Sequence, residues 1–166
     1  MKKQNITLIG MAGAGKSSVG TILAHSLGWS FQDIDKLMEE DYGKPLQNIL
    51  NELGDDSFIE EEASKMKELS KIQNAVIAPG GSIIYSREAM ELLKNISIVV
   101  YIHADPKSIE ERIDANSRGI VGLEGKTFQK LFEERENLYK QFADITVDAS
   151  QKTPTEIAAE ILSIVV

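Results

Sequence analysis

The sequence predicts an α/β fold, and three observations support this prediction. The chain has 166 residues, enough for one domain with a sizeable buried core. Five short apolar runs alternate with amphipathic segments of helical period, which is the pattern of parallel strands covered by helices on both faces. A glycine-rich loop stands between the first apolar run and the first helical segment. We therefore expect a three-layer P-loop fold with a five-stranded parallel sheet, formed by residues 1–166 as a single domain.

The five apolar runs are the predicted strands. The first, NITLIGM, precedes the glycine-rich loop, and the second, WSFQDID, ends in acidic residues. The third, NAVIAPGG, runs into a Pro-Gly-Gly turn, and the fourth, SIVVYIHA, is the most hydrophobic run of the chain. The fifth is the short run ITVDA. These strands are predicted at residues 5–11, 29–35, 74–81, 97–104 and 145–149.

Helical periodicity fills most of the sequence between these strands. In the first helical segment Val19, Leu23 and Leu27 share one face, and Gly28 ends the segment. Pro106 suits the first turn of a later helix. The predicted helices are 15–28, 36–53 with a break near 43–45, 57–71 after a break at Gly54, 86–94, 105–115, 127–141 and a last one from about 153.

Composition and charge exclude several classes of protein. Hydrophobic residues make up 42% and charged residues 27% of the chain, as in ordinary globular proteins. The net charge of −8 argues against a general nucleic-acid or membrane binder, since either needs a basic face. The sequence has no cysteine, which excludes disulfides, thiolate metal sites and a cysteine nucleophile. It has no apolar run long enough for a membrane span or a signal peptide, so the expected location is the cytoplasm.

Arginine is scarce and unevenly placed. Of the 18 basic residues only Arg87, Arg112, Arg118 and Arg135 are arginines, and three of these fall between residues 112 and 135. The guanidinium group suits bidentate binding of phosphate or carboxylate, so this segment is a candidate anion site. The alternative is that these are solvated charges on helix surfaces.

The stretch GMAGAGKSS matches the phosphate-loop pattern G-x-x-x-x-G-K-[ST]. Gly10 and Gly15, with Gly13, let the backbone curl so that successive amide groups point at phosphate oxygens. Lys16 can reach the outer phosphates, and the Ser17 hydroxyl can bind Mg²⁺. Because a predicted strand precedes the loop and a helix follows, the sequence predicts a nucleotide-phosphate site.

A phosphate loop alone does not identify the phosphate acceptor. The GTPase interpretation needs an N-K-x-D guanine-binding motif and a D-x-x-G switch, and neither occurs in a suitable place. A small kinase needs carboxylates after the second strand and a flexible lid with arginine. The polar, glycine-rich segment 116–125 fits a mobile lid, and a chain of 166 residues leaves little room for a second domain or a motor. A small kinase is therefore favoured.

Asp33 and Asp35 end the second predicted strand, on the same side of an extended segment. The carboxyl ends of parallel strands face the ligand crevice. One of these carboxylates could hold the metal's water shell, and the other could orient or deprotonate an acceptor hydroxyl. The alternative is a helix N-cap with a solvated acidic neighbour.

Further motifs follow the phosphate loop in a specific order: FQDID, FIEEE, APGGS, the arginine-bearing NSRGIVG, and ERENLYKQFAD before ITVD. In this order and spacing the chain resembles the shikimate kinase family over nearly its whole length. The resemblance implies a nucleoside-monophosphate-kinase-like fold with a closing lid at about 116–125 and an acceptor-binding helical region at about 36–71. It also implies ATP and Mg²⁺ as donor and cofactor, and a small hydroxyl compound, shikimate or a relative, as acceptor.

The resemblance also implies roles for matching residues. The residues expected to act in catalysis are Lys16, Asp35 and Arg118. Those expected to bind the nucleotide are Gly13, Ala14, Gly15, Lys16, Ser17, Ser18, Arg112, Arg118 and Pro154, with Ser17 and Asp33 at the metal. Those expected to bind the acceptor are Asp35, Gly80, Gly81 and Arg135, the last through an acceptor carboxylate.

The acceptor half departs from the family's pattern. The motif F-R-x-x-E carries a second arginine for the acceptor carboxylate, whereas this chain has Ile59 there. Losing that charged contact implies roughly 10- to 100-fold weaker carboxylate binding. Glu60, Glu61 and Glu62 would repel an acidic acceptor if they face the pocket. In addition, Ser82 replaces the third glycine of the turn.

Three hypotheses therefore remain. The first is an ATP-dependent shikimate kinase or close relative, in which a lysine such as Lys65 substitutes for the missing arginine. The second is a kinase of the same fold with a different hydroxyl acceptor. The third is an ATP-binding regulatory or interaction module, which does not explain the presence of Asp35, Arg118 and Arg135. No nucleic-acid or membrane partner is expected, and a monomer is favoured.

Overall fold

The computed structural model describes residues 3–116 and 120–166. Five parallel strands form one sheet in the order β2-β3-β1-β4-β5. Their bounds are β1 Asn5–Ile9, β2 Ser30–Asp33, β3 Ala75–Ala78, β4 Ile98–His103 and β5 Ile145–Asp148. The predicted α/β class and parallel sheet are confirmed.

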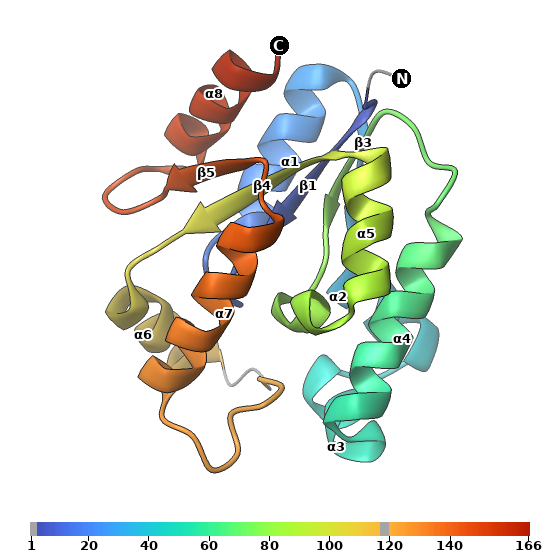
Figure 1. Ribbon diagram of the computed structural model, residues 1–166, viewed down its shortest axis with the longest axis vertical. Coiled ribbons are helices and arrows are strands. Elements are labelled where there is room, and N and C mark those ends of the chain that lie inside the picture. The colour runs from blue at the N-terminus through green and yellow to red at the C-terminus, as the bar shows by residue number, and fades with distance from the viewer. Residues whose placement is uncertain (1–2, 117–119) are drawn as a thin grey trace.

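Helices cover both faces of this sheet, as Figure 1 shows. Helices α1 and α8 pack against each other on one face, and α5 and α7 contact β4 on the other. The helices are α1 Lys16–Leu27, α2 Ile34–Tyr42, α3 Leu46–Leu53, α4 Asp55–Glu68, α5 Arg87–Ile96, α6 Pro106–Asn116, α7 Phe128–Phe142 and α8 Pro154–Val165, with a 3₁₀ helix η1 at Gly81–Tyr85.

The inner strands are buried and the edge strands are partly exposed. Every residue of β1 and β3 is buried, whereas β2 and β5 at the two edges carry exposed residues. Strands enclosed on both faces require side chains that are apolar in both directions, which explains the continuous apolar runs in the sequence. The core therefore lies on both sides of the β3-β1-β4 centre.

The strand order places a ligand crevice at the carboxyl ends of the central strands. The chain leaving β1 continues to the β3-β2 side of the sheet, and the chain leaving β4 continues to the β5 side. Connections that diverge in this way leave a crevice at the strand ends, where α/β proteins bind ligands. The glycine-rich loop lies there because it follows β1 directly.

Helix α1 approaches β2 closely at Gly20. This glycine is buried, and a Cβ atom added to it would overlap the Phe31 ring. The absence of a side chain therefore sets the distance between the helix that begins at the phosphate loop and the strand that ends at Asp33.

Two local features differ from the sequence-based expectation. The second strand ends at Asp33, and Asp35 lies in the first turn of α2, so the expected extended segment through Asp35 is wrong. The Asp33 side chain accepts a hydrogen bond from the Lys36 amide and caps α2, and this interaction turns the chain into a helix. The 3₁₀ helix η1 was not expected, because its apolar sequence GSIIY has no helical period.

Candidate functional site

The glycine-rich loop has the geometry of a phosphate-binding loop. Gly15 is the N-cap of α1 with φ of 95°, a left-handed conformation that favours glycine. Amide groups in the first turn of a helix have no partner within the helix and are available to an anion. The Lys16 ammonium donates hydrogen bonds to the carbonyl oxygens of Gly10 at 2.7 Å and Met11 at 2.9 Å. The loop thus combines amide donors with a buried cation.

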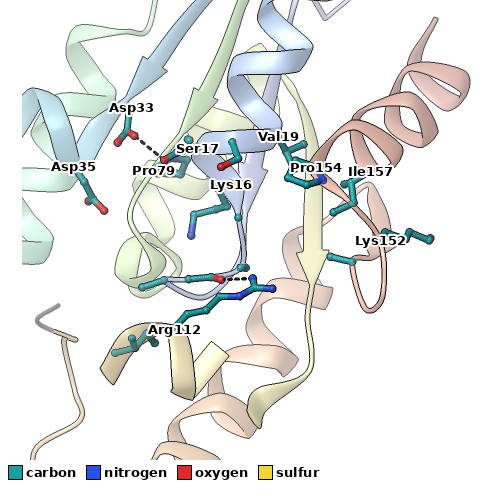
Figure 2. A pocket seen from close by; sticks show the side chains of 18 residues that line it. Lys16, Ser17, Val19, Asp33, Asp35, Pro79, Arg112, Lys152, Pro154 and Ile157 are labelled. Carbon is teal, nitrogen blue, oxygen red and sulfur yellow. Dashed lines mark hydrogen bonds between the residues drawn. The ribbon is translucent and has the colours of Figure 1, made fainter. Parts of the chain in front are cut away.

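Ser17 and Asp33 bring two oxygen ligands together beside this loop. The Ser17 hydroxyl donates to Asp33 Oδ2 at 2.7 Å, as Figure 2 shows. Hydroxyl and carboxylate oxygens are ligands of the kind that Mg²⁺ takes from proteins, usually with substrate phosphates and water completing the shell. No cluster of three or more acidic or histidine ligands occurs among the described residues. The pair therefore fits a magnesium ion held partly by nucleotide phosphates.

A cavity of about 370 Å³ extends from the phosphate loop to the start of α8. Arg112 of α6 reaches the loop, and its Nη1 donates to the Gly13 carbonyl oxygen at 2.8 Å. In Figure 2 Asp33 and Asp35 lie on one side of the loop, and Pro154 and Ile157 lie on the other. The described residues that were predicted for the nucleotide and the metal all line this cavity: Gly13, Ala14, Gly15, Lys16, Ser17, Ser18, Asp33, Arg112 and Pro154.

A second, smaller cavity of about 30 Å³ lies next to the first. Its lining includes the four residues predicted for the acceptor, Asp35, Gly80, Gly81 and Arg135. Asp35 and Ala12 line both cavities. The Asp35 carboxyl group therefore stands where a group bound in one cavity would meet a group bound in the other.

Arg135 is a buried cation on α7, only 1% exposed. Its Nη2 donates to the Val121 carbonyl oxygen at 2.5 Å, and its guanidinium carbon lies 5.4 Å from the centre of the Tyr85 ring. The Tyr139 hydroxyl, also on α7, donates to the Gly81 carbonyl oxygen at 2.6 Å. Helix α7 thus fixes both the cation and the turn of the second cavity.

Ile59, which stands where the family's motif has an arginine, does not line the second cavity. Ile59 lies in a separate surface groove with Tyr85, one residue along α4 from Phe58, which does line the cavity. Lys65 makes ion pairs with Asp41 and Glu68 instead. Among the described lining residues, the only cation is Arg135. The idea that Lys65 replaces the arginine is therefore wrong.

The three consecutive glutamates differ from one another in their surroundings. Glu60 is exposed, whereas Glu62 is fully buried and lines the second cavity. Burial, together with the nearby Asp35 carboxylate, raises the pKa of Glu62 to about 8. A carboxyl group with this pKa is mostly neutral at pH 7, so the expected repulsion of an acidic acceptor by Glu62 does not arise at that pH.

Sequence reasoning missed three residues of the second cavity and its rim. Glu62 was considered only as a repelling charge and Ser82 only as a departure, yet the Ser82 hydroxyl donates to Glu62 Oε2. Tyr85 packs on Arg135, and nothing in the sequence marks it as a site residue except its place four residues after Gly81. Arg118, the predicted lid arginine, lies outside the described residues. Ile120 and Val121, in the segment predicted to form the lid, line the second cavity.

Comparisons with known proteins agree with this arrangement. The family model described as shikimate kinase matches residues 12–166. A shikimate kinase of Enterococcus faecalis is 36% identical over 163 residues, covering 96% of each chain. One from a Sulfurihydrogenibium species is 34% identical over 161 residues, again covering 96% of each chain. No helix in the described part of the chain has the length and apolar character needed to cross a bilayer.

Solved structures show the same similarity. The structure titled as shikimate kinase from Acinetobacter baumannii in complex with shikimate aligns with a TM-score of 0.88 at 29% identity, covering 99% of this chain and 93% of that one. The shikimate kinase of Aquifex aeolicus aligns with a TM-score of 0.80 at 32% identity, covering 96% and 94%. From its phosphate loop, its two adjoining cavities and these matches, the chain belongs to the shikimate kinase family of ATP-dependent phosphotransferases.

Proposed function

We propose that this protein transfers the γ-phosphoryl group of ATP to a hydroxyl group of shikimate. The observation that carries the proposal is the position of Asp35, which lines both the phosphate-loop cavity and the cavity of Arg135. A carboxylate at that junction can accept a hydrogen bond from an acceptor hydroxyl while the hydroxyl faces the terminal phosphate.

Different residues bind the phosphates, bind the acceptor and accept the proton. The loop amides and Lys16 hold the phosphates, and Arg135 binds the acceptor carboxylate. Asp35 takes the proton of the acceptor hydroxyl while the oxygen of that hydroxyl forms a bond to the γ-phosphorus. The bond from that phosphorus to the bridging oxygen breaks, and ADP leaves with the electron pair. In such transfers positioning and charge stabilisation supply most of the catalysis.

Ser17 and Asp33 are the residues proposed to hold Mg²⁺. Their oxygen atoms are already within hydrogen-bond distance of each other beside the loop. When bound there, the ion would neutralise negative charge on the phosphate oxygens. Arg118 stays a prediction for the transferring phosphate, and Arg112 and Pro154 stay predictions for the nucleotide base.

A second candidate function is a kinase of the same fold with another hydroxyl acceptor. The lining of the second cavity favours it, because Arg135 is the only cation among the described residues there. A carboxylate bound by one guanidinium group gains less than one bound by two, since each charge-assisted hydrogen bond contributes about 1.5–3 kcal/mol.

A coupled assay of ADP release over a panel of acceptors tests both candidates. The panel contains shikimate, other hydroxy acids, sugars and amino alcohols, with a Lys16→Ala variant prepared identically to exclude a contaminating kinase. We expect turnover of shikimate above all other compounds. Faster turnover of a compound without a carboxylate would replace the first proposal by the second. ATP binding without turnover of any compound would favour the non-catalytic module.

The location and assembly of the protein stay predictions. We propose the cytoplasm, where ATP is available, and a monomer.

A further inference from the structure

A buried side-chain contact joins α4 to the turn that follows β3. Ser82, in η1, is 4% exposed, and Glu62, on α4, is 0% exposed. The Ser82 hydroxyl donates a hydrogen bond to Glu62 Oε2. A hydroxyl at position 82 thus fixes one oxygen of a fully buried carboxyl group.

The other oxygen of Glu62 lies beside Asp35 and Gly80, two residues that line the second cavity. Glu62 Oε1 and Asp35 Oδ1 lie against Gly80, in the space that a Cβ atom would occupy. Within residues 3–116 and 120–166, Glu62 Oε1 has no hydrogen-bond partner. Glu62, Asp35 and Gly80 all line the second cavity. A buried polar atom without a partner is costly, so a ligand group that pairs with it gains affinity.

The groups around Glu62 come from several elements. Asp35 of α2 is the anion that interacts with Glu62, Arg135 of α7 and Lys16 of α1 are the cations, and Tyr139 of α7 also interacts electrostatically with Glu62. Burial and Asp35 raise the pKa of Glu62, whereas the Ser82 hydrogen bond and the two cations lower it. The raising effects are larger, so the carboxyl group holds a proton at neutral pH.

We propose that Ser82 is a positioning residue of the acceptor site, whose hydroxyl orients Glu62 so that the second carboxyl oxygen presents a proton to an acceptor hydroxyl. The proposal rests on the proposed function, because it concerns the acceptor of that reaction. A neutral carboxyl group can donate to a hydroxyl oxygen without repelling the acceptor's carboxylate. An ionised one in the same place would repel that carboxylate across a poorly solvated cavity.

Ser82 donates a hydrogen bond to Glu62, and Ile59 stands on the same helix as Glu62. Residue 59 stands three positions before Glu62 on α4, so an arginine there would be a neighbour able to pair with Glu62. This chain has Ile59 instead, and the serine hydroxyl at position 82 supplies the hydrogen bond.

Calorimetric binding of shikimate between pH 6 and 9.5, without nucleotide, tests the proposal. For the unmodified protein we expect affinity to fall roughly tenfold across this range as Glu62 ionises. Glu62→Gln should remove this fall. Ser82→Ala should weaken binding at pH 7 by severalfold. It should also move the loss of affinity to higher pH, because the Ser82 hydrogen bond favours ionised Glu62 and its removal raises the pKa of that carboxyl group. Circular dichroism verifies that each variant is folded.

Matched controls come from the same helix. Ser64→Ala and Glu60→Gln change exposed residues of α4 and should leave both the affinity and its pH dependence as in the unmodified protein. A purely structural role of Ser82 would weaken binding equally at every pH. That result, or a pH profile that Glu62→Gln leaves unchanged, would overturn the proposal.

A readout without ligand separates this proposal from the proposed function. Carbon-13 NMR of labelled glutamate carboxyls, assigned by comparison with Glu62→Gln, follows the titration of Glu62 in the free protein. We expect this titration to move to higher pH in Ser82→Ala, and an unchanged titration contradicts the proposal. If shikimate fails to bind at any pH, the proposed acceptor is wrong, while the NMR titration still decides whether Ser82 acts on Glu62.

Discussion

The sequence pattern around Asp35 predicts its place at the end of β2 but not the helix in which it lies. The pattern D-I-D suggests two carboxylates on one side of a strand, but the chain turns into α2 after Asp33. The turn follows from the capping hydrogen bond between Asp33 and the Lys36 amide, a local interaction that competes with the extended conformation. Asp35 still reaches both cavities, because the first turn of α2 lies at the carboxyl edge of the sheet.

Replacing Asp35 by asparagine should lower kcat with little effect on ATP binding. The amide keeps the size of the side chain but cannot accept the proton of the acceptor hydroxyl, and general-base catalysis contributes roughly 10²- to 10⁴-fold. Steady-state kinetics and calorimetric ATP titration measure the two effects. Asp33→Asn is the comparison, since it should instead raise the magnesium concentration needed for half-maximal rate. Equal kcat in Asp35→Asn and the unmodified protein would refute the role of Asp35.

The roles of Glu62 and Ser82 could not be predicted from their local sequence. Both residues are polar and lie in segments that fit an exposed helix or a turn equally well. Their pairing depends on α4 packing against η1, twenty residues later in the chain. The phosphate loop, in contrast, is local: its glycines, lysine and serine fall within residues 10–17, so this part of the nucleotide site was predictable from one stretch.

The strands and the long helices could be predicted from the spacing of apolar residues, because each is buried along one face or on all sides. The central strands are buried on both faces and gave continuous apolar runs, and the long helices gave a 3.6-residue period. The element that was missed, η1, has only five residues, too few for a period to appear. It nevertheless contributes Gly81 and Ser82 to the lining of the second cavity.

Helix α8 begins with a capping box that also positions part of the nucleotide cavity. Thr153 Oγ1 accepts from the Glu156 amide at 3.2 Å, and Glu156 Oε2 accepts from the Thr153 amide at 2.7 Å. Pro154, the first residue of the helix, lines the cavity. The cap thus holds a residue proposed to contact the nucleotide base.

Removing this cap should affect stability and nucleotide binding together. Thr153→Ala should lower the free energy of unfolding by about 0.5–2 kcal/mol. We expect a modest rise in the KM for ATP and no change in the KM for the acceptor. Urea unfolding and steady-state kinetics measure both, with Ser163→Ala, an exposed change in the same helix, as control. A selective rise in the acceptor KM would contradict the placement of α8 beside the nucleotide.

An arginine placed at position 59 of α4 should strengthen the binding of an acidic acceptor. Ile59 shares a groove with Tyr85, whose ring packs on the Arg135 guanidinium, so a long cationic side chain can extend toward the acceptor site. Ile59→Arg should lower the KM for shikimate roughly 10- to 100-fold. Ile59→Leu, which adds no charge, should leave it unchanged. An unchanged KM in Ile59→Arg would show that a second cation at this position does not serve the acceptor.

At the scale of the whole molecule, the protonation of Glu62 should make stability depend on pH. The unfolded chain's carboxyl titrates near 4.5, and the folded protein's near 8. Between these values the folded state binds a proton that the unfolded state has released, so rising pH favours unfolding by about 1.4 kcal/mol per pH unit from this group. The contribution is fully present below pH 4.5 and is lost as pH rises through 8.

Unfolding of Glu62→Gln by urea at several pH values measures this contribution. The stability of the variant relative to the unmodified protein should increase from pH 5 to pH 8 and then level off. Glu60→Gln, which removes an exposed carboxylate of the same helix, is the matched control. A constant difference for Glu62→Gln would mean that Glu62 is already ionised in the folded protein at pH 5.

The close approach of α1 and β2 at Gly20 has a consequence for how the protein tolerates mutation. Ser17 lies one turn before Gly20, and Asp33 lies two residues after Phe31, so this contact sets the spacing of the two oxygen atoms proposed to bind the metal. Any side chain at position 20 would push the helix and strand apart. In a saturation-mutagenesis library selected for activity, Gly20 should therefore be as intolerant of substitution as the catalytic residues, although it is not among the residues that line either cavity.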